Sequence, residues 1–230
     1  MNTERAKEVV TALTDFVNNQ ESCKDMSAEE SKRNIEDGIV NIVLKKDLGF
    51  KIEEHKSQGL LITNDGYFLT ANHCLDHNFD EGSIKTNRGK FEIWMTKRES
   101  PMYDLVLAKA HLPGECSARK YRISELKPSL DKRGISLINE NGRIRDHIGL
   151  RQSSSEPSRL KNKKILLDQM EFFLPTWEFG HSGAPFIDYR GNLMGISSAA
   201  YANTESIAKI SHAMEMITSY VNKLKSKYGV

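Results

Sequence analysis

Ser182 lies between two glycines in the stretch GHSGAP, residues 180–185, and a strand-like run stands on either side. A serine hydroxyl is a weak nucleophile at neutral pH, and it attacks a carbonyl only when a neighbouring base takes its proton. That base is usually a histidine, whose tautomer is commonly fixed by a buried carboxylate. Glycine and serine are also common in ordinary turns, so the stretch indicates a nucleophilic serine only if the chain also supplies a histidine and an acid.

His73 and Asp104 are the best candidates for those two partners. His73 stands in FLTANHCLD, where a strand-like run ends, and Asp104 opens the run DLVLAKA. An acid at the mouth of a buried strand is costly unless another group pairs with it. Taken singly, a structural histidine and a strand-capping aspartate are the more ordinary readings. Taken together, the three residues each lie at a strand-to-loop junction, which favours a nucleophilic triad.

Short β-strands are predicted through the part of the chain that must position these residues. The runs are IVNIVL (39–44), the two arms of LLITNDGYFLTA (60–71), FEIWM (91–95), DLVLAKA (104–110), GISLI (134–138), RIRDHIGL (143–150) and KILLDQMEFF (164–173). Turn residues such as Asn141-Gly142 and Arg190-Gly191-Asn192 separate strands. So many short strands with almost no internal helix predict an all-β barrel or sandwich.

Helices are predicted at both ends of the chain. Apolar residues recur at helical spacing near the N-terminus, with Thr3 as the expected cap, and SAEE at 27–30 is a capping box with Ser27 as cap. Near the C-terminus an apolar stripe predicts a helix that docks on the β-structure: Met214, Ile217, Val221 and Leu224. The expected domains are a helical extension at 1–37, a β domain at 38–210 and a C-terminal helix at 211–230.

Composition narrows the classes of function. The 230 residues carry 33 Lys and Arg against 31 Asp and Glu, and so balanced a charge argues against nucleic acid or an anionic membrane as partner. No apolar run approaches the roughly 18 residues of a membrane helix. The N-terminus lacks the pattern of a secretory signal. Cys23, Cys74 and Cys116 form no CxxC pair, which predicts reduced thiols and a cytoplasmic location.

Three stretches together resemble the chymotrypsin-fold, or trypsin-like, serine proteases. TANHC resembles their TAAHC-type histidine motif, YDLVLAKA their D-[IL]-A-L-[LV] motif and GHSGAP their G-[DN]-S-G-G-P motif. The resemblance covers residues 38–210, and its compact spacing is more similar to bacterial and high-temperature-requirement-like members than to digestive enzymes. It implies a double β-barrel that hydrolyses peptide bonds of protein substrates through an acyl-enzyme, without a cofactor.

Carried over residue by residue, the resemblance implies a role for each position. Ser182 is the nucleophile, His73 the general base and acid, and Asp104 the orienting carboxylate. The backbone N–H groups of Gly180 and Ser182 form the oxyanion hole. Thr176 falls at the base of the specificity pocket, which implies a preference for a small or medium uncharged residue. The walls of that pocket are Ser198, Ala199 and Ala200. The N-terminal extension could hold a regulatory partner or a second copy.

Two residues depart from the family's pattern. His181 stands where digestive enzymes carry an Asp that pairs with a newly cut amino terminus, so that activation switch is not expected. Ala184 replaces the second glycine of the nucleophile motif. These departures keep open an alternative, a catalytically silent or partner-activated binding module on the same fold. A zinc site at His73, Cys74 and His77 is not expected, because no second cluster completes four ligands.

Overall fold

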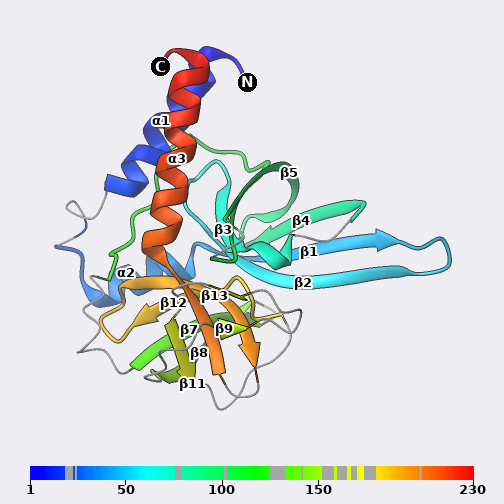
Figure 1. The fold of residues 1–230 in the computed structure, drawn as a ribbon, viewed down its shortest axis with the longest axis vertical. Helices are drawn as coiled ribbons and strands as arrows, with labels where there is room; N and C mark the ends of the chain where they lie inside the picture. The colour runs from blue at the N-terminus through cyan, green and yellow to red at the C-terminus, as the bar shows by residue number, and fades with distance from the viewer. Residues whose placement is uncertain are drawn as a thin grey trace.

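A computed structural model shows a β-rich protein with helices at both ends of the chain (Figure 1). The residues that it describes are 1–18, 23, 25–75, 79–100, 103–124, 133–140, 142–151, 158–159, 165–166, 170–173, 180–201 and 204–230. Its helices are α1 (Thr3–Asn18), α2 (Ala28–Glu36) and α3 (Ile210–Tyr228), with one 3₁₀ turn, η1 (Asn72–Cys74). Within the described residues, no helix is long and apolar enough to cross a membrane.

A closed antiparallel barrel follows the two N-terminal helices. Its strands are β1 (Ile39–Asp47), β2 (Ile52–Leu61), β3 (Tyr67–Ala71), β4 (Glu81–Thr86), β5 (Gly89–Ser100) and β6 (Leu105–Ala110). They run in the order β1-β2-β3-β6-β5-β4, and β4 pairs back on β1 to close the barrel. The prediction of a largely β fold built on a barrel is confirmed.

The second half of the chain forms another closed sheet. Its strands are β7 (Arg133–Glu140), β8 (Arg143–Arg151), β11 (Met170–Phe173), β12 (Pro185–Asp188), β13 (Leu193–Tyr201) and β14 (Thr204–Lys209), beside a small ladder of β9 (Ser158–Arg159) and β10 (Ile165–Leu166). The order β11-β14-β13-β12-β7-β8 closes because β8 pairs with β11. Counted along the chain, both barrels have the strand order 1-2-3-6-5-4. The two halves therefore share one topology.

Two of the strands in the first barrel are buried on both faces. Successive side chains on a strand point to opposite sides. Phe68 on β3 accordingly packs inside the barrel with Val106 of β6, whereas Leu69 and Leu107 point to the seam between the barrels. The strands β3 and β6 are thereby fixed from both sides, and each ends or begins at one of the predicted catalytic residues.

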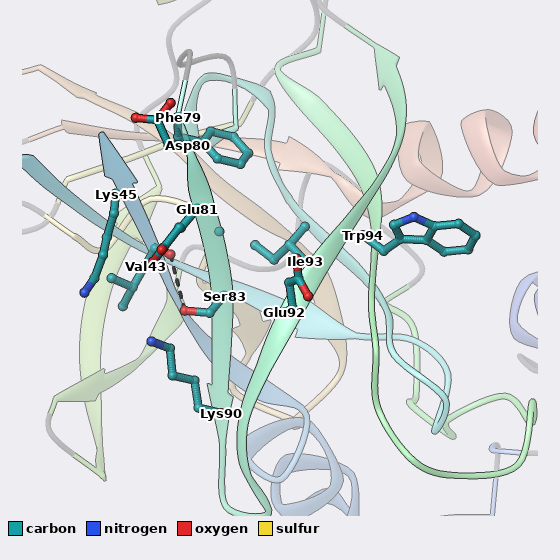
Figure 2. Close-up of a pocket in the computed structure, with 11 residues that line it drawn as sticks. Val43, Lys45, Phe79, Asp80, Glu81, Ser83, Lys90, Glu92, Ile93 and Trp94 are labelled. Atoms are coloured by element: carbon teal, nitrogen blue, oxygen red, sulfur yellow. Dashed lines mark hydrogen bonds between the residues drawn. The ribbon is translucent and has the colours of Figure 1, made fainter. Parts of the chain in front are cut away.

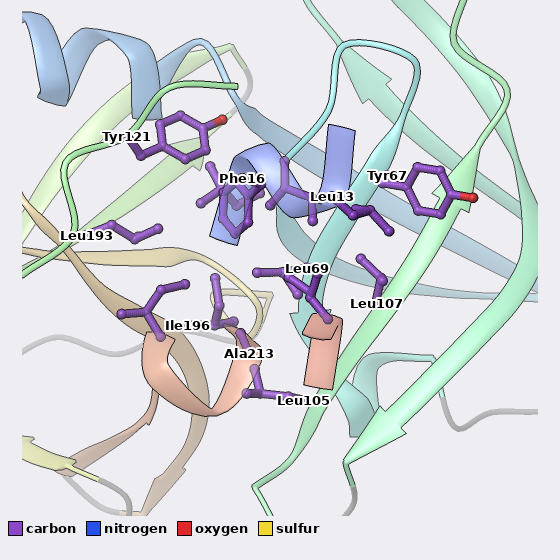
Figure 3. Close-up of a cluster of buried hydrophobic side chains, with 14 of the residues drawn as sticks. Leu13, Phe16, Tyr67, Leu69, Leu105, Leu107, Tyr121, Leu193, Ile196 and Ala213 are labelled. Carbon is purple, nitrogen blue, oxygen red and sulfur yellow. The ribbon is translucent and has the colours of Figure 1, made fainter. Parts of the chain in front are cut away.

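The helix α1 is an integral part of the core at that seam. Leu13 and Phe16 are fully buried, and they pack among side chains from both barrels and from α3. Figure 3 shows them with Tyr67, Leu69, Leu105, Leu107, Tyr121, Leu193, Ile196 and Ala213. In Figure 1 α1 and α3 lie side by side, with both chain ends at the same pole of the molecule. The segment predicted as an extension therefore completes the main core.

A buried ion cluster also ties α1 to the first barrel. The carboxylate of Asp65, in the turn between β2 and β3, accepts from Arg5 Nη2 of α1 at 2.5 Å and from Thr63 Oγ1 at 2.6 Å, and it pairs with Lys109. Burial alone would raise the pKa of Asp65, but the hydrogen bonds from Lys109 and Thr63 and the two positive charges lower it. A buried carboxylate requires such partners, so Asp65 anchors α1.

The helix ends agree with the sequence in part. Ser27 Oγ accepts the N–H of Glu30 at 3.1 Å, which confirms Ser27 as the cap of α2. The prediction of Thr3 as a cap is wrong: α1 begins at Thr3, and Asn2 Oδ1 accepts the N–H of Arg5 at 2.9 Å. Asparagine and threonine are both good caps, so two such residues in succession leave the helix start ambiguous in sequence. The docking of α3 through its apolar stripe is confirmed, although Met214 is only half-buried.

Candidate active site

His73 and Asp104 are brought together by the pairing of β3 with β6. Ala71, the last residue of β3, is opposite Leu105, the first residue of β6. Two loops that lie far apart in sequence therefore emerge at one edge of the barrel. Asp104 Oδ2 accepts from His73 Nδ1 at 2.7 Å, and Oδ1 accepts from the backbone N–H of His73 at 2.9 Å. The carboxylate thus fixes both the tautomer and the position of the imidazole.

Asp104 adopts a backbone conformation that few residues tolerate. Its φ is 51°, in the left-handed region, where a residue other than glycine is strained by about 1–3 kcal/mol. Aspartate and asparagine visit this region more readily than other residues with a side chain. The carbonyl oxygen of Asp104 accepts from Asn72 N–H at 2.9 Å, which helps to hold the turn. With Asp104 only 3 % exposed, the carboxylate lies in a fixed, desolvated position.

Ser198 reaches this carboxylate from the second barrel. Its hydroxyl donates to Asp104 Oδ2 at 2.5 Å, and the residue is 2 % exposed. The sequence placed Ser198 in the wall of a specificity pocket, whereas its hydroxyl points at the acid. The pairing of β13 with β14 is irregular between Ser197 and Ala200, and a bulge of this kind redirects side chains. The side chains of Ala199 and Ala200, and the whole of Thr176, lie outside the described residues.

The loop that carries Ser182 is joined to both barrels. The N–H of Gln58 on β2 donates to the carbonyl of Ser182 at 2.8 Å, and the N–H of Gly183 donates to Ser197 O on β13 at 2.7 Å. Thr70 Oγ1 in turn donates to Gln58 O at 2.6 Å, and Thr70 lies on β3, the strand that ends beside His73. Ser182 is therefore held against β2, which is linked in turn to β3, the strand that ends beside His73.

Gly183 has to be a glycine because of that close packing. A Cβ built on it would lie 1.9 Å from Gln58 O and 2.2 Å from Thr70 Oγ1, and its φ is 87°. We expect Gly183→Ala to lower the free energy of unfolding by about 2–4 kcal/mol, from overpacking and left-handed strain together. Urea unfolding of both variants measures the difference.

Gly142→Ala is the matched control for that experiment. Gly142 has a φ of 90° with nothing within 4 Å of a built Cβ, so this variant feels only the backbone strain, about 1 kcal/mol. Equal losses in the two variants would mean that the loop of Ser182 is not packed as described.

Gly180 needs glycine for a different reason. Its φ is 100°, but the nearest atom to a built Cβ is Lys56 O at an ordinary 3.7 Å, so conformation and not crowding decides. Among the described residues, neither the N–H of Gly180 nor that of Ser182 donates to another part of the chain. The two N–H groups that the family resemblance assigns to an oxyanion hole are therefore unpaired among the described residues.

Ser182 and His73 are not joined in this structure. Within the described part of the chain no hydrogen bond links Ser182 Oγ to the imidazole, and Cys74 Sγ lies 3.8 Å from His73 Nε2. Nε2 is the atom that would take the serine proton. The His73 side chain is 37 % exposed, so the imidazole is accessible from solvent. Such contacts are often loose without substrate and tighten in the reacting complex.

His181 and Ala184, the two departures from the nucleophile motif, are both buried. The ring of His181 is 5 % exposed and meets His147 of β8 edge to face, with the ring centroids 5.2 Å apart. His147 Nε2 in turn lies 3.7 Å from Glu140 Oε1. Ala184 is fully buried, and its N–H donates to the carbonyl of His181 at 3.1 Å, which closes the turn under Ser182. Both residues that depart from the motif are thus packed within the second barrel.

The pKa of His73 is displaced by its surroundings. Burial by itself would lower it, but the hydrogen bonds to Asp104 and Cys74 and the negative charge of Asp104 outweigh that effect. The net result is a pKa raised above the ordinary imidazole value of about 6.5. The protonated imidazolium is therefore the stabilised form of the His73 side chain.

A separate pocket of about 650 Å³ lies on the first barrel (Figure 2). It is formed by β1, β4, β5 and the residues just before β4, and its lining includes Lys45, Glu81, Lys90 and Glu92. None of His73, Asp104 and Ser182 lines it, so this pocket is not the site described above. Among the described residues, no three His, Cys, Asp or Glu side chains are grouped to hold a metal ion.

Comparisons with known proteins leave the chain without an assigned family. It matches no protein-family model, and no curated protein is significantly similar to it. Function has to be inferred from the arrangement of side chains. Sequence alone pointed to His73, Asp104 and Ser182 but missed the role of Ser198, because no local pattern marks a serine that bonds to a residue 94 positions away.

Proposed function

We propose that the protein is a serine endopeptidase with a chymotrypsin-like double β-barrel. The carrying observation is the chain of hydrogen bonds that runs from Ser198 through Asp104 to His73, because a carboxylate so held orients an imidazole as a base. The shared strand order of the two barrels and the meeting of their residues at the seam support this reading. The substrate is a protein or peptide, no cofactor takes part, and the three cysteines, which form no disulfide within the described residues, favour a cytoplasmic location.

The proposed reaction assigns one role to each of these groups. Ser182 Oγ attacks the substrate carbonyl while His73 Nε2 takes its proton, and the N–H groups of Gly180 and Ser182 receive the oxyanion. The imidazolium is stabilised through Nδ1 by Asp104 and then returns the proton to the leaving amine. Water repeats the sequence on the acyl-enzyme and releases the second product.

Labelling with a fluorophosphonate tests this proposal. The serine oxygen displaces fluoride from phosphorus, and His73 takes the proton, so only an activated serine reacts. We expect a single phosphonyl adduct by intact mass on the folded protein, and none on Ser182→Ala or on heat-unfolded protein. If the folded protein stays unlabelled, peptidase activity of the isolated chain is excluded.

One observation favours a second version of the same function. The missing hydrogen bond between Ser182 and His73 suits an enzyme whose site is completed by substrate or a partner. In that version the chain is a partner-activated module, as the departures at His181 and Ala184 also allow. Labelling that appears only when a protein substrate is added would distinguish it from a constitutive enzyme.

The raised pKa of His73 has a consequence for pH dependence. Only neutral His73 accepts the serine proton, so the labelling rate should fall as pH drops through a value above the ordinary 6.5 or so. The stability of the fold depends on pH in the direction opposite to the labelling rate. A raised pKa stabilises the fold below about pH 6.5, and that contribution is lost as pH rises through the folded pKa.

Cys74→Ala provides the control for this profile. Because the Cys74 thiol helps to raise the pKa of His73, its removal should move the acidic limb of the labelling rate to lower pH. An acidic limb at or below pH 6.5 in the unaltered protein would contradict the assignment of His73 as a base paired with Asp104.

A further inference from the structure

His212 is a buried titratable group that the mechanism above does not use. His212 lies in the first turn of α3 and is 8 % exposed. Its ring stacks face to face on Tyr103, with the centroids 3.8 Å apart and the planes within 6° of parallel. Tyr103 immediately precedes Asp104 in the chain. A flat and extensive contact thus joins the C-terminal helix to the neighbour of the catalytic carboxylate.

The unusual backbone conformation of Asp104 has to be held in place from the Tyr103 side of the turn. Its left-handed φ of 51° is sparsely populated and persists only where the surroundings impose it. The bonds to His73, Ser198 and Asn72 act on the side chain and carbonyl of Asp104 itself. The stack acts on the residue before it, whose position sets the direction in which the chain enters Asp104.

The helix α3 is a firm base for such a restraint. Ile210, Ala213 and Ile217 are buried in the core at the seam, on either side of His212 in sequence. Glu215, one turn further on, places Oε2 3.8 Å from His212 Nδ1. The α3 backbone is therefore fixed, and the His212 ring is fixed with it.

We propose that His212 is a positioning residue for the catalytic triad, holding Tyr103 so that Asp104 keeps the conformation in which its carboxylate meets His73. The flat face of the His212 ring makes the contact that holds Tyr103. The predicted effect on reaction rate rests on the proposed function, whereas the pairing of His73 with Asp104 can be measured without any substrate.

Two substitutions at His212 separate the flat ring from mere burial. His212→Leu keeps an apolar side chain but removes the flat face, and His212→Phe keeps the face without the ring nitrogens. In His212→Leu we expect the pKa of His73, followed by NMR titration, to fall toward its ordinary value, and fluorophosphonate labelling to slow about tenfold, as for a loss of one stacking contact. In His212→Phe both should be restored.

A second variant on the barrel side protects the test against a misfolded His212→Leu. Tyr103 is half-buried, so Tyr103→Leu is the milder change. It should lower the pKa of His73 in the same way, and the double variant should lose no more than either single one. Additive losses would overturn the proposal, because they would mean that the two rings act separately.

The outcomes of these experiments also distinguish the positioning role of His212 from the proposed peptidase function. An unchanged His73 pKa in His212→Leu, or a change that His212→Phe does not restore, overturns the positioning role. If the unaltered protein takes no fluorophosphonate while the pKa of His73 still responds to His212→Leu, then the peptidase function fails and the positioning role stands.

Discussion

Replacing Ser182 with alanine should lower the turnover of a peptide substrate about 10⁶-fold, the loss seen when a triad nucleophile is removed. The oxyanion donors and the binding surface would remain, so a residual rate of about 10³–10⁴ over water is expected. The fold should not change. Ser182 is half-buried, and its structural bond is made by its carbonyl to Gln58, which alanine retains.

Ser198→Ala is the matched control, since it removes a hydroxyl from the same site. Ser198 donates to a charged acceptor, and loss of such a bond costs about 1.5–3 kcal/mol, or roughly 10–100-fold in rate. Initial rates on one peptide ester, with equal thermal unfolding of both variants, measure the contrast. Comparable losses for Ser182→Ala and Ser198→Ala would show that Ser182 supports the site without attacking the substrate.

Asp104→Asn should reduce turnover about 10⁴-fold by forcing His73 into the wrong tautomer. Oδ1 accepts from the backbone N–H of His73, so the amide oxygen must take this position and the amide nitrogen must face Nδ1. An N–H donor there requires His73 to carry its proton on Nε2. That atom could then no longer accept the proton of Ser182.

This substitution isolates chemistry from folding because asparagine, like aspartate, tolerates a left-handed backbone. We expect Asp104→Asn to unfold close to the unaltered protein, whereas Asp104→Ala should be less stable as well as inactive, since alanine is strained at a φ of 51°. Urea unfolding and peptide hydrolysis measure the two effects. Turnover within tenfold of the unaltered protein in Asp104→Asn would rule out His73 as the base.

Local patterns were sufficient to predict most of the strands and both terminal helices, and they indicated three candidate catalytic positions. Alternation of apolar residues is a property of a few neighbouring residues, so it can be read from any short stretch of sequence. His73, Asp104 and Ser182 could be found because each stands at the end of such a stretch. The strand order could not be found, since it depends on which distant strands pair, as Ala71 does with Leu105.

The missed features are all long-range. Nothing near Ser198 in sequence indicates that its hydroxyl bonds to Asp104, and nothing near Tyr103 indicates that a helix more than 100 residues later covers its ring. For the same reason, α1 was predicted as an extension: its apolar face is visible in sequence, but the partner that buries it is not. The specificity pocket depends on Thr176, which lies outside the described residues.

The packing of α1 against α3 sets the order in which a growing chain can mature. During synthesis the first barrel, with His73 and Asp104, leaves the ribosome well before Ser182, and α3 emerges after both barrels. Until then Leu13 and Phe16 lack part of the core that buries them, and Tyr103 lacks the ring of His212. Until α3 has been made, a nascent chain would therefore lack both the complete core at the seam and the ring that stacks on Tyr103.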